Sequence, residues 1–440
     1  MFIQFSVANF RSFKTMQTLS MQAATIRSKQ PQLDENNVFE VSPKLQLLTT
    51  KAIYGANASG KSNIIKALLA FMWSIKQSVS MQDILNQLIK KYELSTENNN
   101  EPTFFQLVFT VKNKENKDIV YRYGFEVKDN EILTEWLFGT PKRVEVPYFV
   151  REGMTVTVNE RVFKGAKKFE NLSKKGDNEI FRNNSLFLSA TAAMGVTEAK
   201  NIIDVIDNLS ILSGLEDHQL RQFISQKFKE SNVSTQKEIL QFLKSADLCM
   251  EAIFVKDNNQ DDFFKNLPNE LKELAKKGEI KPTPSFYSTR SKYNSENEKV
   301  GEVTQNIDEW ESEGTKKMLD LSLLLLRTLE EGRTLLIDEF DARLHPLLTK
   351  KIVSLFNSKL TNPHHAQLIF VTHDTSLMKP SFLRRDQICF VEKDKFGSST
   401  LKTLVEFKGT RNDDSYEKEY LRGAYGAVPF LNNFENGFLK

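Results

Sequence analysis

Eight residues near the start of the chain, from Gly55 to Ser62, read GANASGKS and fit the pattern G-x-x-x-x-G-K-[ST]. In this spacing the glycines let successive backbone N–H groups point at an anion, and the following helix adds its dipole. Lys61 supplies a mobile positive charge for the β- and γ-phosphates, while the Ser62 hydroxyl can ligate Mg²⁺. The sequence predicts a strand at 46–54 and a helix at 61–77, so a chance glycine-rich turn is disfavoured. We therefore expect a nucleoside triphosphate site.

A second group of polar residues follows two later predicted strands. TLLID ends in Asp338 and is followed by Glu339, and QLIFVTH ends in His373. Asp338 is placed to hold Mg²⁺ through water, and Glu339 to polarise the water that attacks the γ-phosphate. A strand that ends in Asp-Glu is common by chance. His373 strengthens the interpretation, because ligands of an open α/β sheet bind at the carboxyl ends of its strands.

Just upstream, residues 311–316 read ESEGTK and open a predicted helix at 315–330. A Ser-x-Gly turn at a helix start offers free N–H groups and a hydroxyl to a phosphate. Taken alone, Ser312 is an ordinary N-cap residue. Its position in the chain does not establish that it serves the same nucleotide as Lys61.

The spacing of these residues determines the expected architecture. Lys61 and Asp338 are 277 residues apart, far more than a compact domain needs to place two neighbouring strands. Period-two alternation over 103–158 predicts an antiparallel meander, and helical periodicity dominates 197–277. We expect an α/β fold in which the nucleotide domain is split. Its expected parts are an N-terminal half at 1–195, an inserted helical lobe at 196–300 and a C-terminal half at 301–440.

Composition excludes several classes of protein. The 440 residues carry 60 Lys+Arg against 57 Asp+Glu, so the net charge of +3 lacks the bulk basic excess of a nucleic-acid coat. Cys249 and Cys389 lie too far apart in the chain for a paired-CxxC zinc site and do not suggest a disulfide framework. We expect any metal to be held by oxygens and phosphates. Signal-peptide and membrane-spanning patterns are missing, so a soluble cytoplasmic protein is expected.

The motifs YGANASGKSN, ESEGTKK, TLLIDEFDARLHP and FVTHD, with the opening NFRSF, resemble the ABC-type ATPase head of SMC, RecF and OLD-family proteins. They resemble more closely the bacterial AAA-labelled ATP-binding proteins of the RloA and AbiL type, found in anti-phage and abortive-infection systems. The ending YLRGAYGAVPFL also looks like that group. The resemblance implies an ABC-type P-loop head that uses ATP and Mg²⁺ and assembles as a homodimer or larger oligomer around sandwiched ATP. It further implies an effector nuclease or toxin as partner, with DNA or a phage-encoded component as trigger.

The resemblance also implies a role for each matching position. The ATP-binding positions are Arg11, Gly55, Asn57, Gly60, Lys61, Ser62 and Asn63. Ser312, Gly314 and Lys316 match the signature motif, which contacts the γ-phosphate held by the opposite subunit. Ser62 and Asp338 match the metal ligands, Glu339 the catalytic base, His373 the switch histidine and Asp341 the D-loop. The signature reads SEG in place of LSGGQ, which weakens a transporter interpretation. Gln106 is a candidate Q-loop residue, although a solvent-facing strand glutamine is the simpler interpretation.

Two other functions stay open. An OLD-like nuclease would need a further acidic cluster, for which Glu392, Asp394 and the pair Asp413-Asp414 are the candidates; the short tail leads us to expect no intrinsic nuclease. A RecF-like repair ATPase would bind duplex DNA directly. Its phosphate contacts would come from the basic run 164–175 together with Arg151, Arg161 and Arg182, a run that also fits a solvated loop.

Overall fold

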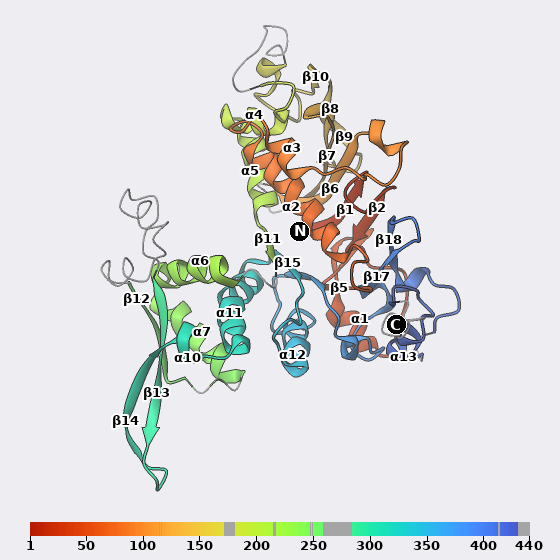
Figure 1. Ribbon diagram of the computed structural model, residues 1–440. Helices are drawn as coiled ribbons and strands as arrows, with labels where there is room; N and C mark the ends of the chain where they lie inside the picture. Colours follow the sequence, from red (N-terminus) through yellow and green to blue (C-terminus); the bar gives the residue numbers. More distant parts are fainter. Residues whose placement is uncertain are drawn as a thin grey trace, which may run out of the picture. The chain divides into compact units, whose positions relative to one another are not determined.

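The computed structural model describes residues 1–113, 115, 117–170, 181–213, 217–246, 248, 250–257, 284–411 and 414–429, with backbone alone at 213 and 217–219. The chain divides into two compact units (Figure 1). The first unit comprises Met1–Leu212, Glu331–Glu339 and Val353–Lys440, and the second comprises Ser213–Glu330 and Phe340–Ile352. Each unit is built around its own sheets.

The first unit contains a seven-stranded antiparallel sheet in the order β10-β9-β8-β7-β6-β1-β2. Its strands are β1 (Phe2–Ala8), β2 (Gln17–Ser20), β6 (Thr103–Lys112), β7 (Asp118–Lys128), β8 (Glu131–Gly139), β9 (Val146–Glu152) and β10 (Thr155–Val158). The meander over β6 to β10 confirms the period-two prediction. Because β1 pairs with β6, the meander continues the sheet that the N-terminal hairpin begins.

A six-stranded sheet in the same unit has the order β11-β15-β16-β5-β17-β18. Its strands are β11 (Leu209–Ser213), β15 (Thr334–Asp338), β16 (Gln367–Val371), β5 (Thr50–Tyr54), β17 (Ile388–Lys393) and β18 (Ser399–Thr403). Strands β15, β16, β5 and β17 run parallel. Every residue of β5, β15 and β16 is buried, as expected for parallel strands that are covered on both faces.

The order of these strands corrects one expectation from the sequence. The strand before the phosphate loop and the strand that ends in the acids are not neighbours, because β16 lies between β5 and β15. The sequence could not show this order, since β16 follows both strands in the chain and still inserts between them.

Helix α2 (Lys61–Gln77) begins and ends where the sequence predicts. Its apolar stripe is buried and contacts β1, β15 and two other helices of this unit, α4 (Phe187–Ala193) and α5 (Thr197–Asp207). Phe71 of α2 packs against Phe5, Phe105 and Phe125, with ring centroids 5.4–6.3 Å apart. The helix therefore joins the core of both sheets and is rigidly seated where the phosphate loop meets it.

Smaller elements complete the first unit. They are α1 (Pro31–Asn37), the hairpin β3 (Val38–Ser42) and β4 (Leu45–Leu48), α3 (Ile84–Leu88), and α13 (Tyr416–Leu421). Short 3-10 turns include η4 (Thr375–Leu377). Cys389 of β17 is buried, and burial raises the pKa of its thiol to about 11. Cys249 lies outside the described residues.

The second unit combines helices with a three-stranded sheet in the order β12-β13-β14. Its elements are α6 (Asp217–Glu230), α7 (Val233–Ser245), β12 (Ala252–Lys256), β13 (Ser285–Tyr293), β14 (Lys299–Asn306), α10 (Ile307–Trp310) and most of α11 (Glu313–Glu331); α12 (Pro346–Phe356) begins here and ends in the first unit. The sequence analysis predicted helices in this part and no strands in the polar stretch after 291. Figure 1 shows β13 and β14 as a long hairpin that extends beyond the helices of its unit.

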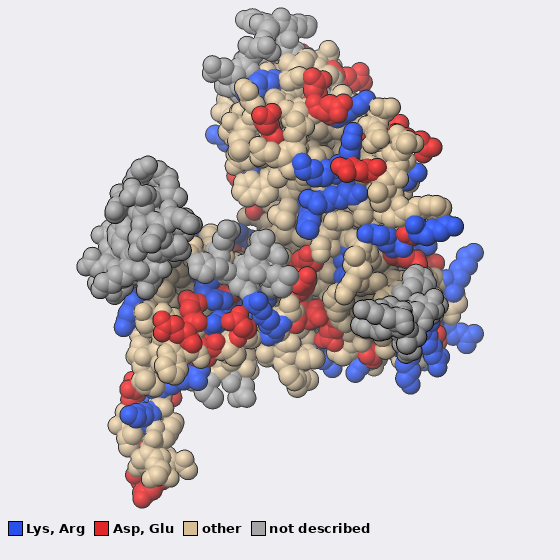
Figure 2. All heavy atoms as spheres, viewed as in Figure 1, with Lys and Arg blue, Asp and Glu red and all other residues tan. Residues whose placement is uncertain are grey.

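Charge and hydropathy agree with the composition. Figure 2 shows acidic and basic side chains interspersed over the visible face, in keeping with the net charge of +3. Within the ranges given above, none of the helices has the length and hydropathy needed to cross a bilayer.

Candidate nucleotide site

Three parallel strands of the first unit end at one edge of the six-stranded sheet. Ile337 pairs with Phe370, and Val371 pairs with Ile53, so β15, β16 and β5 finish at the same level. Neighbouring strands lie about 4.8 Å apart, which places the end of β15 about 10 Å from the end of β5. This edge therefore brings together the phosphate loop, the acid pair and the loop that carries His373.

The phosphate loop is held in a conformation that depends on glycine. Gly60 has a φ of 107°, and a Cβ added there would lie 2.4 Å from Ser399 Oγ and 2.7 Å from Ser12 Oγ. A Cβ at Gly55 would lie 2.5 Å from the carbonyl oxygen of Val391. Helix α2 starts directly after Gly60, which has no side chain with which to cap it. The first N–H groups of α2 thus suit an anion, as the sequence predicted.

Two serines that the sequence analysis missed fasten this loop. Ser399 Oγ donates to the carbonyl oxygen of Ser59 over 2.6 Å, and Ser399 N donates to the carbonyl oxygen of Ser12 over 2.7 Å. Asn63 Nδ2 donates to Ser12 Oγ over 2.7 Å, so the amide of this predicted ATP-binding residue holds the loop in place. Ser12 lies inside the NFRSF motif and could have been suspected. Ser399 comes from β18 and gave no signal in the sequence.

Lys61 and Ser59 show how well the loop fits a triphosphate. Lys61 Nζ donates to the carbonyl oxygens of Gly55 and Ala56 over 2.8 and 2.9 Å, so the ammonium group lies across the loop. Ser59 Oγ is buried and lacks a hydrogen-bond partner among the described residues. Asn57, in contrast, is exposed at the tip of the loop. Mobile ammonium, open helix start and an unused hydroxyl form a donor set that fits phosphate oxygens.

The acid pair has a strained backbone at the residue expected to be the base. Asp338 is buried at the end of β15, and its Oδ1 accepts the N–H of Glu339 over 3.1 Å. Glu339 has a φ of 50°, a left-handed conformation that costs a non-glycine residue roughly 1–2 kcal/mol. Such strain persists where the surrounding structure enforces it and is concentrated at functional sites. Asp338 and the half-buried Ser62 supply the oxygen donors that Mg²⁺ prefers.

His373 follows β16 and is exposed. Its neighbours fix the loop: Thr372 is buried, and the Asp374 side chain accepts the N–H of Ser376 over 3.0 Å to cap η4. The hydroxyl of Tyr54 donates to the carbonyl oxygen of Asp374 over 3.1 Å. Since Tyr54 immediately precedes Gly55, this bond ties the phosphate loop directly to the histidine loop.

The C-terminal motif packs against the same strands. The Tyr420 ring lies 5.3 Å from Phe390 and 6.1 Å from Tyr54, and Thr375 Oγ1 donates to Glu417 Oε1 over 2.7 Å. Helix α13 ends as predicted, with Gly423 at a φ of 82°. The sequence analysis found no role for this segment. The structure shows it bound to both loops of the site.

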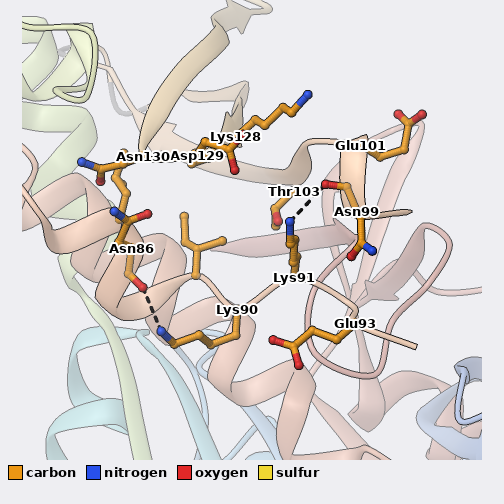
Figure 3. Close-up of a pocket in the computed structure, with 13 residues that line it drawn as sticks. Asn86, Lys90, Lys91, Glu93, Asn99, Glu101, Thr103, Lys128, Asp129 and Asn130 are labelled. Atoms are coloured by element: carbon orange, nitrogen blue, oxygen red, sulfur yellow. Dashed lines mark hydrogen bonds between the residues drawn. The ribbon is translucent and has the colours of Figure 1, made fainter. Parts of the chain in front are cut away.

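Arg11 lies in a tight turn at the start of the chain. Its φ is 50°, its N–H donates to the carbonyl oxygen of Lys90 over 2.7 Å, and its side chain is exposed. Next to this turn is a cavity of about 210 Å³ (Figure 3). Lys90 and Lys91 extend along its wall and donate to the carbonyl oxygens of Asn86 and Asn99. The cavity supports the Arg11 turn, and its charges are mixed.

The signature turn, residues 311–316, belongs to the second unit. Ser312 Oγ accepts the N–H of Thr315 over 3.2 Å, which confirms its N-cap role. Gly314 packs closely against the turn that follows Asp341: an added Cβ would lie 2.8 Å from the carbonyl oxygen of Arg343. Glu313 accepts from Lys316 over 3.0 Å and from Arg343 over 3.0 Å. The signature turn and the D-loop therefore form one contiguous site, with Ser312 exposed.

Several candidates of the alternative functions prove to be structural. Arg151, expected to face DNA, is fully buried, and its Nη1 donates to Glu135 Oε2 over 3.4 Å and to the carbonyl oxygen of Ser185 over 2.5 Å. Arg182 Nη2 donates to the carbonyl oxygens of Ser78 and Val79. The expectation that these two arginines contact phosphates is wrong, because both satisfy internal carbonyl groups. Arg161 and Lys164 are exposed, whereas 171–175 lie outside the described residues.

The tail acids and Gln106 also have local partners. Asp394 Oδ1 accepts the N–H groups of Phe396 and Ser398, and Asp414 Oδ2 accepts that of Arg411. Asp413 lies outside the described residues. Gln106 Oε1 accepts from Arg122 and Trp136 within the meander. Across the part of the chain that the structure describes, no three His, Cys, Asp or Glu side chains cluster as a metal site.

This combination of features defines the class of protein. A parallel sheet leads through a G-x-x-x-x-G-K-S loop into a helix, and an acid pair lies two strands away at the same edge. That is a P-loop ATPase. The sequence model of the family described as "AAA domain, putative AbiEii toxin, Type IV TA system" matches residues 52–183 and 204–379, more than half of the chain. The chain therefore belongs to this family. A comparison with curated proteins gave no match.

Proposed function

We propose that the protein is an ATP-hydrolysing switch that assembles around two ATP molecules, with the signature turn of one copy completing the nucleotide site of another. The observation that supports this most directly is the exposed start of α11, a 19-residue helix. Ser312 is exposed there and Gly314 is packed so tightly that only glycine fits. A helix start of this kind is suited to bind an anion supplied from outside its own unit.

Each side chain of the first unit has a distinct task in this proposal. Lys61 and the first N–H groups of α2 bind the β- and γ-phosphates and orient them. Asp338 and Ser62 hold Mg²⁺, which when bound neutralises charge on the phosphate oxygens. Glu339 orients the attacking water and accepts its proton, and His373 donates a hydrogen bond on the γ-phosphate side. The strained backbone of Glu339 aims its carboxylate without further rearrangement.

The test uses a variant that binds ATP without hydrolysing it. Glu339→Gln is expected to form a stable dimer, or a larger assembly, with ATP and Mg²⁺, measured by light scattering after gel filtration. Glu339→Gln combined with Ser312→Arg is expected to bind ATP and stay monomeric, because the added side chain blocks the signature turn. If Glu339→Gln binds ATP and remains a monomer, the sandwich assembly is refuted.

The family description extends the proposal to a partner. Because it refers to a toxin and to a type IV toxin–antitoxin system, we propose that the ATP cycle controls a separate toxin or nuclease in anti-phage defence. The natural probe is the product of the neighbouring gene, co-expressed with the chain. We expect it to co-purify with Glu339→Gln and ATP and to separate when ATP is replaced by ADP. Equal retention in both nucleotides would overturn ATP control.

A further inference from the structure

Two acids flank the signature turn, and one arginine holds both of them. Arg221 of α6 donates from Nε to Asp320 Oδ1 over 3.1 Å and from Nη2 to Asp320 Oδ2 over 2.7 Å. Its remaining nitrogen, Nη1, donates to Asp308 Oδ1 over 2.7 Å. The pair with Asp320 is a two-pronged guanidinium–carboxylate contact, which fixes direction as well as distance.

The two acids lie on the two helices that meet at the signature turn. Asp308 is in α10, four residues before Ser312, and Asp320 is in α11, eight residues after it. Eight residues correspond to about 12 Å along a helix. Arg221 therefore connects the segment that enters the turn with the helix that leaves it. All three residues belong to the second unit.

Burial makes one of these contacts far stronger than the other. The Asp320 side chain has 0% exposure and that of Arg221 has 13%, whereas that of Asp308 has 44%. Burial raises the pKa of Asp320 to about 6, while the bond from Arg221 acts in the opposite direction. A buried carboxylate that loses its cation is strongly destabilised, so the Asp320 contact anchors α11. The exposed Asp308 contact is weaker and steers α10.

A second arginine supports the same turn. Arg290 of β13 donates from Nη2 to Glu311 Oε1 over 2.5 Å, and the Glu311 side chain has 5% exposure. Glu311 immediately precedes Ser312. The turn is thus held from α6 and from the three-stranded sheet, both of which belong to the lobe whose function the motifs leave unexplained.

We propose that Arg221 is a positioning residue for the signature turn: it fixes α10 against α11 and so sets the direction in which residues 312–314 face the nucleotide of a second copy. This inference rests on the proposed ATP-sandwich function. It gives the helical lobe a part in hydrolysis, because a displacement of α6 would be passed to the turn through one side chain.

The experiment compares ATP binding with turnover. Arg221→Ala is expected to lower kcat at least tenfold and to weaken the ATP-dependent assembly of Glu339→Gln by a similar factor. Binding of a fluorescent ATP analogue at protein concentrations below assembly should change less than twofold, because the phosphate loop belongs to the first unit. Arg221→Lys keeps the charge and loses the two-pronged contact, so it should give an intermediate kcat.

Two further variants guard against misfolding and non-specific effects. Asp308→Ala leaves the buried pair intact and is expected to lower kcat about threefold in a folded protein. The matched control is Lys229→Ala, which removes an exposed ion pair with Asp257 on the same helix and should leave kcat unchanged. The inference is overturned if Arg221→Lys and Asp308→Ala both keep kcat and assembly within 1.5-fold of the parent. If Glu339→Gln itself does not assemble, the proposed function fails, whatever Arg221 does.

Discussion

Replacing Ser399 by alanine tests whether β18 holds the phosphate loop in its binding conformation. Ser399 is fully buried, and its hydroxyl donates to the Ser59 carbonyl oxygen over 2.6 Å. The substitution removes one oxygen atom, more than 300 residues away from the loop in the chain. The backbone bond from Ser399 N to the Ser12 carbonyl oxygen remains.

The size of the effect follows from burial. Without the hydroxyl, the Ser59 carbonyl oxygen loses its partner, which costs about 1–3 kcal/mol for a buried group. The loop can recover part of this by leaving the conformation that binds phosphate. If the whole cost acts on that conformation, the apparent Kd for ATP rises about 5- to 150-fold. We expect a value near the lower end, because water can reach a loop whose tip is exposed.

The assay is a titration with a fluorescent ATP analogue in excess Mg²⁺, with thermal melting measured in parallel. Ser398→Ala is the matched control, since it alters the adjacent side chain and keeps the bond to Ser59. Lys61→Ala marks complete loss of binding. A Kd for Ser399→Ala within twofold of the unmodified protein would refute the idea that this hydroxyl supports the loop.

Three other predictions concern stability. Glu339→Gly should unfold with a free energy about 1 kcal/mol higher than Glu339→Ala, because glycine tolerates a φ of 50°, while both variants lose ATP hydrolysis; equal melting temperatures would contradict this. Arg151→Ala should cost about 3–5 kcal/mol by leaving Glu135 buried and unpaired, whereas the exposed control Arg161→Ala should change stability by less than about 0.5 kcal/mol in the same urea titration. The raised pKa of Asp320 means that the folded chain binds more protons than the unfolded chain between about pH 4 and pH 6. Relative to Asp320→Asn, stability should therefore fall as pH rises through this window, by at most about 1.4 kcal/mol per pH unit, and then level off; a rising difference would contradict the sign.

The phosphate loop was predictable because its signal is local. Its consecutive residues, a buried strand before them and an amphipathic helix after them all agree, and the structure places α2 within the predicted bounds. The supports of the loop were not predictable in the same way. Ser399 reaches Ser59 only because β18 joins the sheet next to β17, a pairing between distant segments that leaves no periodic trace.

Arg151 shows why a charged residue can be misjudged from its neighbours in sequence. It lies on the inward face of β9, directly opposite Glu135 of β8. The alternation of the strand placed it inside, while its charge suggested the surface. A cross-strand pair of opposite charges resolves that conflict, and detecting it requires the strand register.

The hairpin β13–β14 was missed for the opposite reason. β14 is largely exposed along its length, and its residues alternate without a clear apolar face. Strand prediction relies on one buried face, so a hairpin that extends into solvent produces almost no signal. The hydrogen-bonded register with β13 holds it together where side-chain burial does not.

The position of β5 in its sheet has a consequence for how the protein is made. β5 pairs with β16 and β17, which are synthesised more than 300 residues after it. At roughly 5–20 residues per second, a ribosome needs roughly 15–60 s to cover that distance. Throughout this time the phosphate loop has no sheet to hold it. A nascent chain should therefore be unable to retain ATP, and nucleotide binding would report that translation has passed β18.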